Sequence, residues 1–226
     1  SDLASKATPP KLPAKDVNYF QPQEITAILG ALENEPVKWR ALIHLMIVTG
    51  CRRGEIAGLT WDNVDFANSR VYICASLLYS PKNGLYRDTT KTGEARYISL
   101  PAQTVTMLRQ YRTEQLELRL RVGDMWNETG YVFTRDNGQP ITPDSINAFL
   151  RRFADRNGFP HINPHAFRHS MASILISQGQ DVLTVSKRLG HAKVSTTTDI
   201  YSHVIKEADE RASDCIADVL LNTCAK

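Results

Sequence analysis

Two adjacent arginines, Arg52 and Arg53, lie in the segment Thr49–Glu55, just after the glycine that ends a predicted helix. A tight turn that leads into a new helix can aim a side chain into a cleft, and Glu55 is close enough to Arg52 to hold its guanidinium group. The planar guanidinium is well suited to bind a phosphate. An ion pair at this spacing is also common on protein surfaces, so the segment alone does not identify a site.

Five further residues are candidates, although each also has an ordinary explanation. Lys91 lies in a turn between two strand-like runs, where lysines are usually solvated. His165 and Arg168 are three residues apart at the start of a predicted helix, and His191 follows the glycine that ends another. Tyr201 lies ten residues beyond His191. Taken singly, these residues are typical of packing or of a solvated surface.

The set as a whole predicts a chemistry that no single member does. Arginines can bind a phosphodiester and the extra negative charge of its five-coordinate transition state. A tyrosine has a free pKa of about 10 and becomes a nucleophile only near cations and a base, whereas a lysine can protonate a leaving hydroxyl. Two arginines, a lysine, two histidines and a tyrosine around one phosphodiester therefore predict a metal-free route to DNA strand cleavage.

The sequence predicts neither a metal site nor a cofactor site. It contains no H-E-x-x-H motif, EF-hand loop, glycine-rich phosphate-binding motif or G-x-S-x-G motif. His161, His165 and His169 resemble a row of ligands on one helix face, but Pro164 places His161 before the helix begins. His165 and His169 can still meet, and such a pair more often reflects packing or hydrogen bonding than a metal.

The composition is that of a globular protein. Of the 226 residues, 42% are hydrophobic and 23% charged, which excludes a disordered chain, a collagen-like chain and a coiled coil. The net charge is only +3, but residues 151–191 hold six basic and two acidic residues, which favours a phosphate-bearing ligand. No apolar run is long enough for a membrane span or a signal peptide, so we expect a cytoplasmic protein with no membrane partner. The four cysteines form no C-x-x-C pair, which predicts reduced thiols.

The apolar pattern and the capping residues predict a mostly helical α+β fold with a small antiparallel sheet. Thr142, Asn163 and Asp181 are predicted to cap three helices, and Ser195 or Thr196 a further short one. Strands are expected at 70–76, 96–100 and 131–133, with an elaborate hairpin between the first two. The other expected helices cover 21–32, 36–48, 53–59, a segment from Pro101 with an apolar stripe of Val105, Leu108, Tyr111, Leu116 and Leu120, and 205–221.

The chain divides into three parts. Residues 1–20 contain three prolines and few large apolar groups, so we expect an interdomain linker or N-terminal tail there. Residues 21–204 form the expected catalytic domain, and residues 205–226 a C-terminal helical tail. One face of that tail is apolar at helical spacing and the other is acidic, which favours contact with protein over contact with DNA.

Five motifs identify a family resemblance. The sequence resembles the catalytic domain of tyrosine recombinases, the phage integrase family, and is most similar to the integrases of Gram-positive phages and conjugative transposons. The resemblance covers about residues 20–205. The motifs, in chain order, are T-G-x-R-x-x-E at Thr49–Glu55, T-K-T-G-E-A-R around Lys91, H-x-x-R at His165–Arg168, L-G-H at Leu189–His191 and I-Y-S-H around Tyr201.

The resemblance implies the tyrosine recombinase catalytic-domain fold and a role for each matching residue. Glu55 is implied as a supporting residue that orients the arginines. The implied catalytic residues are Arg52 and Arg168 as the clamp on the scissile phosphate, His191 as a hydrogen-bond donor to it, Lys91 as the general acid for the leaving 5′-hydroxyl, His165 as an assistant in proton transfer, and Tyr201 as the nucleophile that forms a 3′-phosphotyrosine link.

Two of these assignments have rivals. Arg53 is the rival of Arg52, although the motif spacing favours Arg52. Lys82 is a distant alternative to Lys91, because the hairpin between Cys74 and Thr90 is longer than in the simplest members of the family.

The function implied by the resemblance is site-specific recombination, in which DNA is cleaved and rejoined without metal or ATP during integration and excision of a mobile element. The implied partners are double-stranded DNA, further copies in a homotetramer on DNA for the full-length protein, and an excisionase or host DNA-bending protein. This chain alone is expected to be a monomer. In the family the segment after the tyrosine commonly passes to the next subunit, so the tail from 205 either packs on its own domain or is exchanged.

Two other functions are consistent with part of the sequence pattern. A type IB topoisomerase would use the same chemistry without pairing two sites, but the L-G-H motif and the acidic tail favour the recombinase. A DNA-binding regulator could use residues 181–201 as a segment similar to a helix-turn-helix. That hypothesis gives no reason for Arg52, Lys91 and Tyr201 to occur together.

Overall fold

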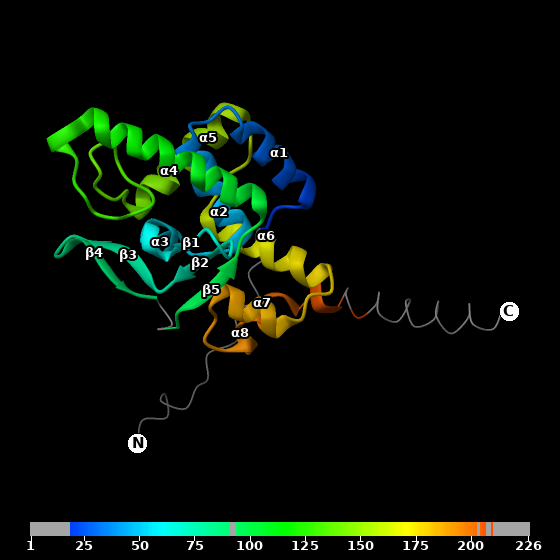
Figure 1. Ribbon diagram of the computed structural model, residues 1–226. Coiled ribbons are helices and arrows are strands. Elements are labelled where there is room, and N and C mark those ends of the chain that lie inside the picture. The colour runs from blue at the N-terminus through cyan, green and yellow to red at the C-terminus, as the bar shows by residue number, and fades with distance from the viewer. Residues whose placement is uncertain (1–18, 91–93, 203, 207–208, 210–226) are drawn as a thin grey trace, which may run out of the picture.

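The protein is mostly helical in a computed structural model that describes residues 19–90, 94–202, 204–206 and 209 (Figure 1). No helix among these residues has the length and apolar character needed to cross a membrane. The α-helices are α1 (Pro22–Leu32), α2 (Val37–Thr49), α3 (Arg53–Ala57), α4 (Ala102–Val122), α5 (Pro143–Asn157), α6 (Pro164–Ser177), α7 (Val182–Leu189) and α8 (Val194–Ile200), with short 3-10 helices η2 (Trp61–Asn63) and η3 (Gly123–Met125).

The strands form two small antiparallel sheets. One has the order β1-β2-β5 and the other is the hairpin β3-β4. The single strand predicted over 70–76 is wrong, because its partner changes at Cys74: Ile73 pairs with Arg96 and Ala75 pairs with Thr89. The strands are β1 (Val64–Asp65), β2 (Arg70–Ile73), β3 (Ala75–Ser80), β4 (Gly84–Thr89) and β5 (Arg96–Ser99).

Helix α2 lies at the centre of the main hydrophobic core. Every residue from Ala41 to Met46 is buried, so the helix is covered on all sides, and it packs against α4 and α6. A second, smaller cluster joins α6, α7 and α8 and includes Met171, Val185, Leu189 and Tyr201. In Figure 1, α7 and α8 lie beside β5 and α6, away from α4. The end of the domain that carries Tyr201 therefore has a core of its own.

The apolar stripe predicted for α4 ends earlier than expected. Leu108 and Tyr111 are buried, but Leu116 and Leu120 are exposed. Gln115 takes the next inward position, four residues after Tyr111, because a step of four stays on one helix face whereas a step of five leaves it. Its amide accepts a hydrogen bond from Trp61 Nε1 at 2.7 Å and donates to two groups of the segment 132–134.

The strand predicted at 131–133 does not form. Tyr131 makes one isolated bridge to Thr60, and Thr134 makes another to Pro140. Val132 and Phe133 are nevertheless fully buried, so this apolar run belongs to the core without forming a strand.

The helix starts follow the capping rule where the cap is a short polar side chain. Thr142, Asn163 and Asp181 each accept a hydrogen bond from the backbone N–H three residues later, as predicted. Helix α8 begins at Val194 with Lys193 as its N-cap, so the predicted cap at Ser195 or Thr196 is wrong. The helix predicted over 205–221 lies almost entirely outside the described residues.

Helix α3 packs so closely on strand β3 that Gly58 has no room for a side chain. A Cβ atom there would lie 2.8 Å from the backbone nitrogen of Leu77 and 3.0 Å from the carbonyl oxygen of Gly54. We expect Gly58→Ala to lower the free energy of unfolding by about 1–3 kcal/mol, because backbone must move. Urea denaturation measures this.

Gly30→Ala is the matched control for that variant. Gly30 lies in α1, and a Cβ atom added there would have no other atom within 4 Å, so we expect a gain of about 0.5–1 kcal/mol from helix propensity. A Gly58→Ala protein as stable as the unsubstituted chain would contradict the close packing of α3 on β3.

Candidate active site

The turn between α2 and α3 positions Arg52. Helix α2 ends at Gly50, whose φ of 63° is the left-handed conformation that favours glycine at a helix end. Two residues later Arg52 becomes the N-cap of α3, and its backbone N–H donates to Glu55 Oε2 at 3.0 Å. The same carboxylate accepts from Arg52 Nη1 at 3.0 Å, as the sequence spacing predicts. The turn therefore fixes both the backbone and the guanidinium of Arg52.

Glu55 is a buried carboxylate that two arginines share. Its side chain has no exposed surface, and Arg96 Nη2 donates to Oε2 at 2.8 Å. Burial alone would raise the pKa of Glu55, but the hydrogen bonds and charges of Arg96 and Arg52 outweigh it and lower the pKa. The carboxylate is thus ionised at neutral pH and orients the Arg52 guanidinium.

Arg168 joins the ends of two helices. It lies in the second turn of α6, and it donates from Nη1 to the Gly50 carbonyl at 2.7 Å and from Nη2 to the Leu189 carbonyl at 2.8 Å. Burial, and then the nearby charge of Arg52, lower the pKa of Arg168 to about 10. The group remains charged at neutral pH, at an electrostatic cost that an anion beside it would relieve.

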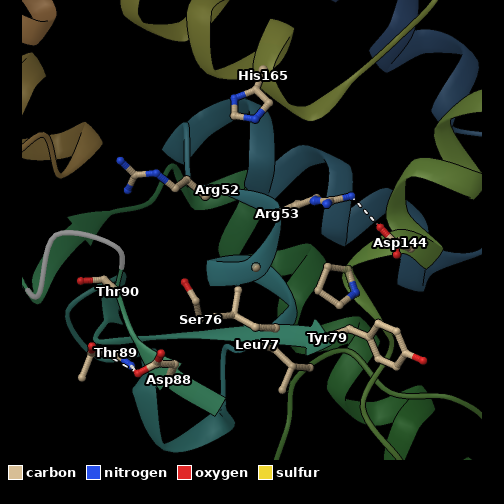
Figure 2. Close-up of a pocket in the computed structure, with 13 residues that line it drawn as sticks. Arg52, Arg53, Ser76, Leu77, Tyr79, Asp88, Thr89, Thr90, Asp144 and His165 are labelled. Atoms are coloured by element: carbon tan, nitrogen blue, oxygen red, sulfur yellow. Dashed lines mark hydrogen bonds and ion pairs between the residues drawn. The ribbon is translucent and has the colours of Figure 1, made fainter. Parts of the chain in front are cut away.

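A cavity of about 670 Å³ opens between α3, α5 and the β3-β4 hairpin (Figure 2). Its lining includes Arg52, His165 and Thr90, the residue before Lys91. Arg53 also lines the cavity, but its guanidinium is bound to Asp144 of α5 at 2.8 Å. Arg52 therefore has the partner expected of an oriented clamp, whereas Arg53 ties α3 to α5.

His191 follows Gly190, the left-handed residue that ends α7. Its Nδ1 atom lies 2.8 Å from the Thr197 hydroxyl of α8. Burial, followed by the charges of Arg168 and Arg52, lowers the pKa of His191 to about 4. The imidazole is neutral at pH 7, and when Thr197 donates to Nδ1 the proton of the ring is on Nε2.

Tyr201 lies in the second core cluster and does not line the cavity. The side chain has no exposed surface, and its hydroxyl lies 2.8 Å from Nδ1 of His169. Burial raises the pKa of Tyr201 to about 12, an effect that the charge of Arg168 partly offsets. Burial also lowers the pKa of His169 to about 4, with His165 and Arg168 adding to the effect. Both partners are neutral, so the hydroxyl is not activated in this arrangement.

Lys91 belongs to the segment 91–93, which lies outside the described residues, so its assignment stays a prediction. Its alternative, Lys82, is exposed in the turn of the β3-β4 hairpin and is not among the residues that line the cavity.

The sequence reasoning missed two residues. For His169 the sequence predicts packing or hydrogen bonding rather than a metal, but it does not predict that the partner is Tyr201. The signal was its place one helical turn after His165. Arg96 ends the T-K-T-G-E-A-R motif, which predicts no role for it, although it binds the buried Glu55. Among the described residues no group of three or more His, Cys, Asp or Glu side chains is arranged to hold a metal ion.

The sequence is similar to those of known recombinases and integrases. The sequence pattern of the phage integrase family matches residues 18–208. A XerC-like tyrosine recombinase of Caldanaerobacter subterraneus subsp. tengcongensis is 30% identical, with 95% of this chain and 57% of that protein covered. The ICEBs1 integrase of Bacillus subtilis is 24% identical, with 92% of this chain and 56% of that protein covered. The chain thus spans little more than half the length of these relatives.

The fold is also similar to that of a solved structure. The Tn1549 transposon integrase in complex with transposon right end DNA superposes with a TM-score of 0.77 at 20% identity, covering 92% of this chain and 68% of that one. The predicted fold class, mostly helical with a small antiparallel sheet, is confirmed.

Proposed function

The chain belongs to the phage integrase family, and from that premise we propose that it cleaves and rejoins DNA in site-specific recombination through a 3′-phosphotyrosine intermediate. One structural observation supports the proposal in addition to family membership. Arg168 donates hydrogen bonds to the carbonyls of Gly50, two residues before Arg52, and of Leu189, two residues before His191, and Arg52 lines a cavity of about 670 Å³. Such a cluster of fixed donors is suited to a phosphate that gains charge in its transition state.

In the proposed reaction Arg52 and Arg168 stabilise the scissile phosphate, and Nε2 of the neutral His191 donates to it. The Tyr201 oxygen forms a bond to phosphorus, the bond from phosphorus to the 5′-oxygen breaks, and Lys91 gives its proton to that oxygen. His165 assists removal of the tyrosine proton. Since Tyr201 is bound to His169 in the core, α8 must move before the attack.

The direct test is covalent capture. The probe is a pool of nicked duplexes with a randomised core, which lose the short leaving strand and so trap the adduct. We expect a protein–DNA adduct that survives a denaturing gel, and sequencing of the captured strands should show a preferred site. A topoisomerase would give an adduct without site preference, and a DNA-binding regulator would give none.

We infer that the reaction needs neither metal nor ATP, because arginine guanidinium groups supply the charge that a metal would otherwise supply. EDTA is expected to leave the adduct yield unchanged, measured on the same gel with and without added magnesium. Loss of the adduct in EDTA and its return with magnesium would contradict this part of the mechanism.

The partners follow from the same proposal. We propose double-stranded DNA as the substrate, in the cytoplasm, during integration and excision of a mobile element. For a longer protein that contains this domain we propose a homotetramer on DNA, with an excisionase or host DNA-bending protein as accessory. Residues 205–226 either pack on their own domain or pass to a neighbouring subunit, and residues 1–20 serve as a linker or tail.

A further inference from the structure

Arg96 is the first residue of β5, and its guanidinium group contacts three other segments of the chain. Nη2 and Nη1 donate to the two oxygens of Glu55 in α3 at 2.8 and 3.3 Å. Nε donates to the carbonyl of Arg188 in α7 at 2.8 Å, and Nη2 lies 3.7 Å from the Cys51 sulfur. The side chain is 9% exposed and does not line the cavity. Its positive charge therefore interacts with Glu55 inside the protein and not with solvent.

The first of these contacts reaches Arg52 through a shared carboxylate. Glu55 Oε1 accepts from both Arg52 and Arg96, and Oε2 accepts from Arg96 and from the Arg52 backbone. Without Arg96, the buried carboxylate would keep Arg52 as its only cationic hydrogen-bond donor among the residues that the structure describes. Removing one partner leaves part of the charge of a buried ionised group uncompensated, and the remaining partner then has no competitor for it. The Arg52 guanidinium would then be drawn toward Glu55 and away from the cavity.

The second contact is with the end of α7, at the turn that precedes His191. Consecutive carbonyls at the end of α7 bind two different arginines: that of Arg188 binds Arg96 and that of Leu189 binds Arg168. A Cβ atom on Gly190 would lie 2.6 Å from Arg96 Nη1 and 2.8 Å from its Cζ. Arg96 therefore packs directly on the Gly190 turn, and it also offsets the negative end of the α7 dipole.

We propose that Arg96 is a positioning residue for DNA cleavage, which holds Glu55 and the end of α7 in one arrangement so that Arg52 and His191 face the same phosphate. The proposal rests on the proposed recombinase function. Lysine cannot replace Arg96, because one ammonium group cannot reach acceptors that Arg96 serves from three separate nitrogens.

The test compares Arg96→Lys with Arg156→Lys. Arg156 is the matched control, because it also pairs with a glutamate, Glu35, but lies in α5 and does not line the cavity. We expect Arg96→Lys to lower the single-turnover rate of adduct formation by about 10- to 100-fold with little change in DNA affinity. Arg156→Lys should change neither quantity.

A double-mutant cycle separates positioning from loss of stability. If Arg96 acts through Glu55 on Arg52, Arg96→Lys should have a much smaller effect in an Arg52→Lys background. Additive effects, an unchanged cleavage rate, or equal losses of binding and cleavage together with a lower melting temperature would each overturn the proposal.

Hydrogen exchange measured without DNA tests the role of Arg96 independently of the proposed recombinase function. The His191 amide is bound to the Ser186 carbonyl at 3.1 Å, and we expect Arg96→Lys to speed its exchange while Arg156→Lys does not. Unchanged exchange would contradict the bridge to α7 whatever the DNA assay gives. A wild-type chain that forms no adduct, with faster exchange in Arg96→Lys, would instead contradict the recombinase function and leave the bridge supported.

Discussion

Tyr201→Phe is expected to abolish the covalent protein–DNA adduct and to leave DNA binding nearly intact, because only the hydroxyl that we propose as the nucleophile is removed. The substitution also removes the hydrogen bond to His169, so we expect a loss of about 1 kcal/mol in the free energy of unfolding. A denaturing gel measures the adduct, and a gel shift on the same DNA measures binding.

Tyr111→Phe is the matched control. Tyr111 is also buried, its pKa is also raised to about 12 by burial, and it lies in α4 outside the cavity. This variant should form the adduct at the normal rate. An adduct from the Tyr201→Phe protein would show that another residue is the nucleophile.

Arg168→Lys is expected to lower the cleavage rate by about 10²- to 10³-fold, which is typical for loss of one fixed donor to a transition state. The substitution keeps the charge, but one amine cannot hold the carbonyls of Gly50 and Leu189 together as the guanidinium does. DNA affinity should fall much less, since phosphate contacts elsewhere remain.

Single-turnover cleavage and equilibrium binding, measured on the same DNA, separate the two effects in Arg168→Lys. Arg119→Lys is the control, because Arg119 forms an exposed ion pair with Glu128 near the end of α4. If Arg168→Lys lowered binding and cleavage by the same factor, Arg168 would only anchor the DNA.

The sequence was sufficient to predict the features that depend on residues close together in the chain. The end of α2 at Gly50, the caps at Thr142, Asn163 and Asp181, and the pairing of Glu55 with Arg52 each depend on residues within a few positions of one another. Local rules describe such features well. The composition and the apolar pattern were likewise enough to predict a mostly helical fold with little sheet.

The cap of α8 is a local failure, but two other failures have a different cause, which is competition between distant segments. The change of strand partner at Cys74 depends on where β4 and β5 lie, and the exposure of Leu116 depends on where the core beneath α4 ends. Neither can be read from residues near those positions. The same applies to the site, because the hydrogen bond between His169 and Tyr201 joins residues 32 apart in the sequence.

If Tyr201 is the nucleophile, as proposed, its burial limits DNA damage by the free protein. A strand-cleaving enzyme whose nucleophile lies in its own core is competent only in the fraction of molecules that have opened. An opening free energy of about 2.7 kcal/mol leaves about one molecule in a hundred competent, and random nicking by free protomers falls by the same factor. A partner or DNA surface that binds the open form would restore the full rate, so damage would be suppressed wherever such binding is absent.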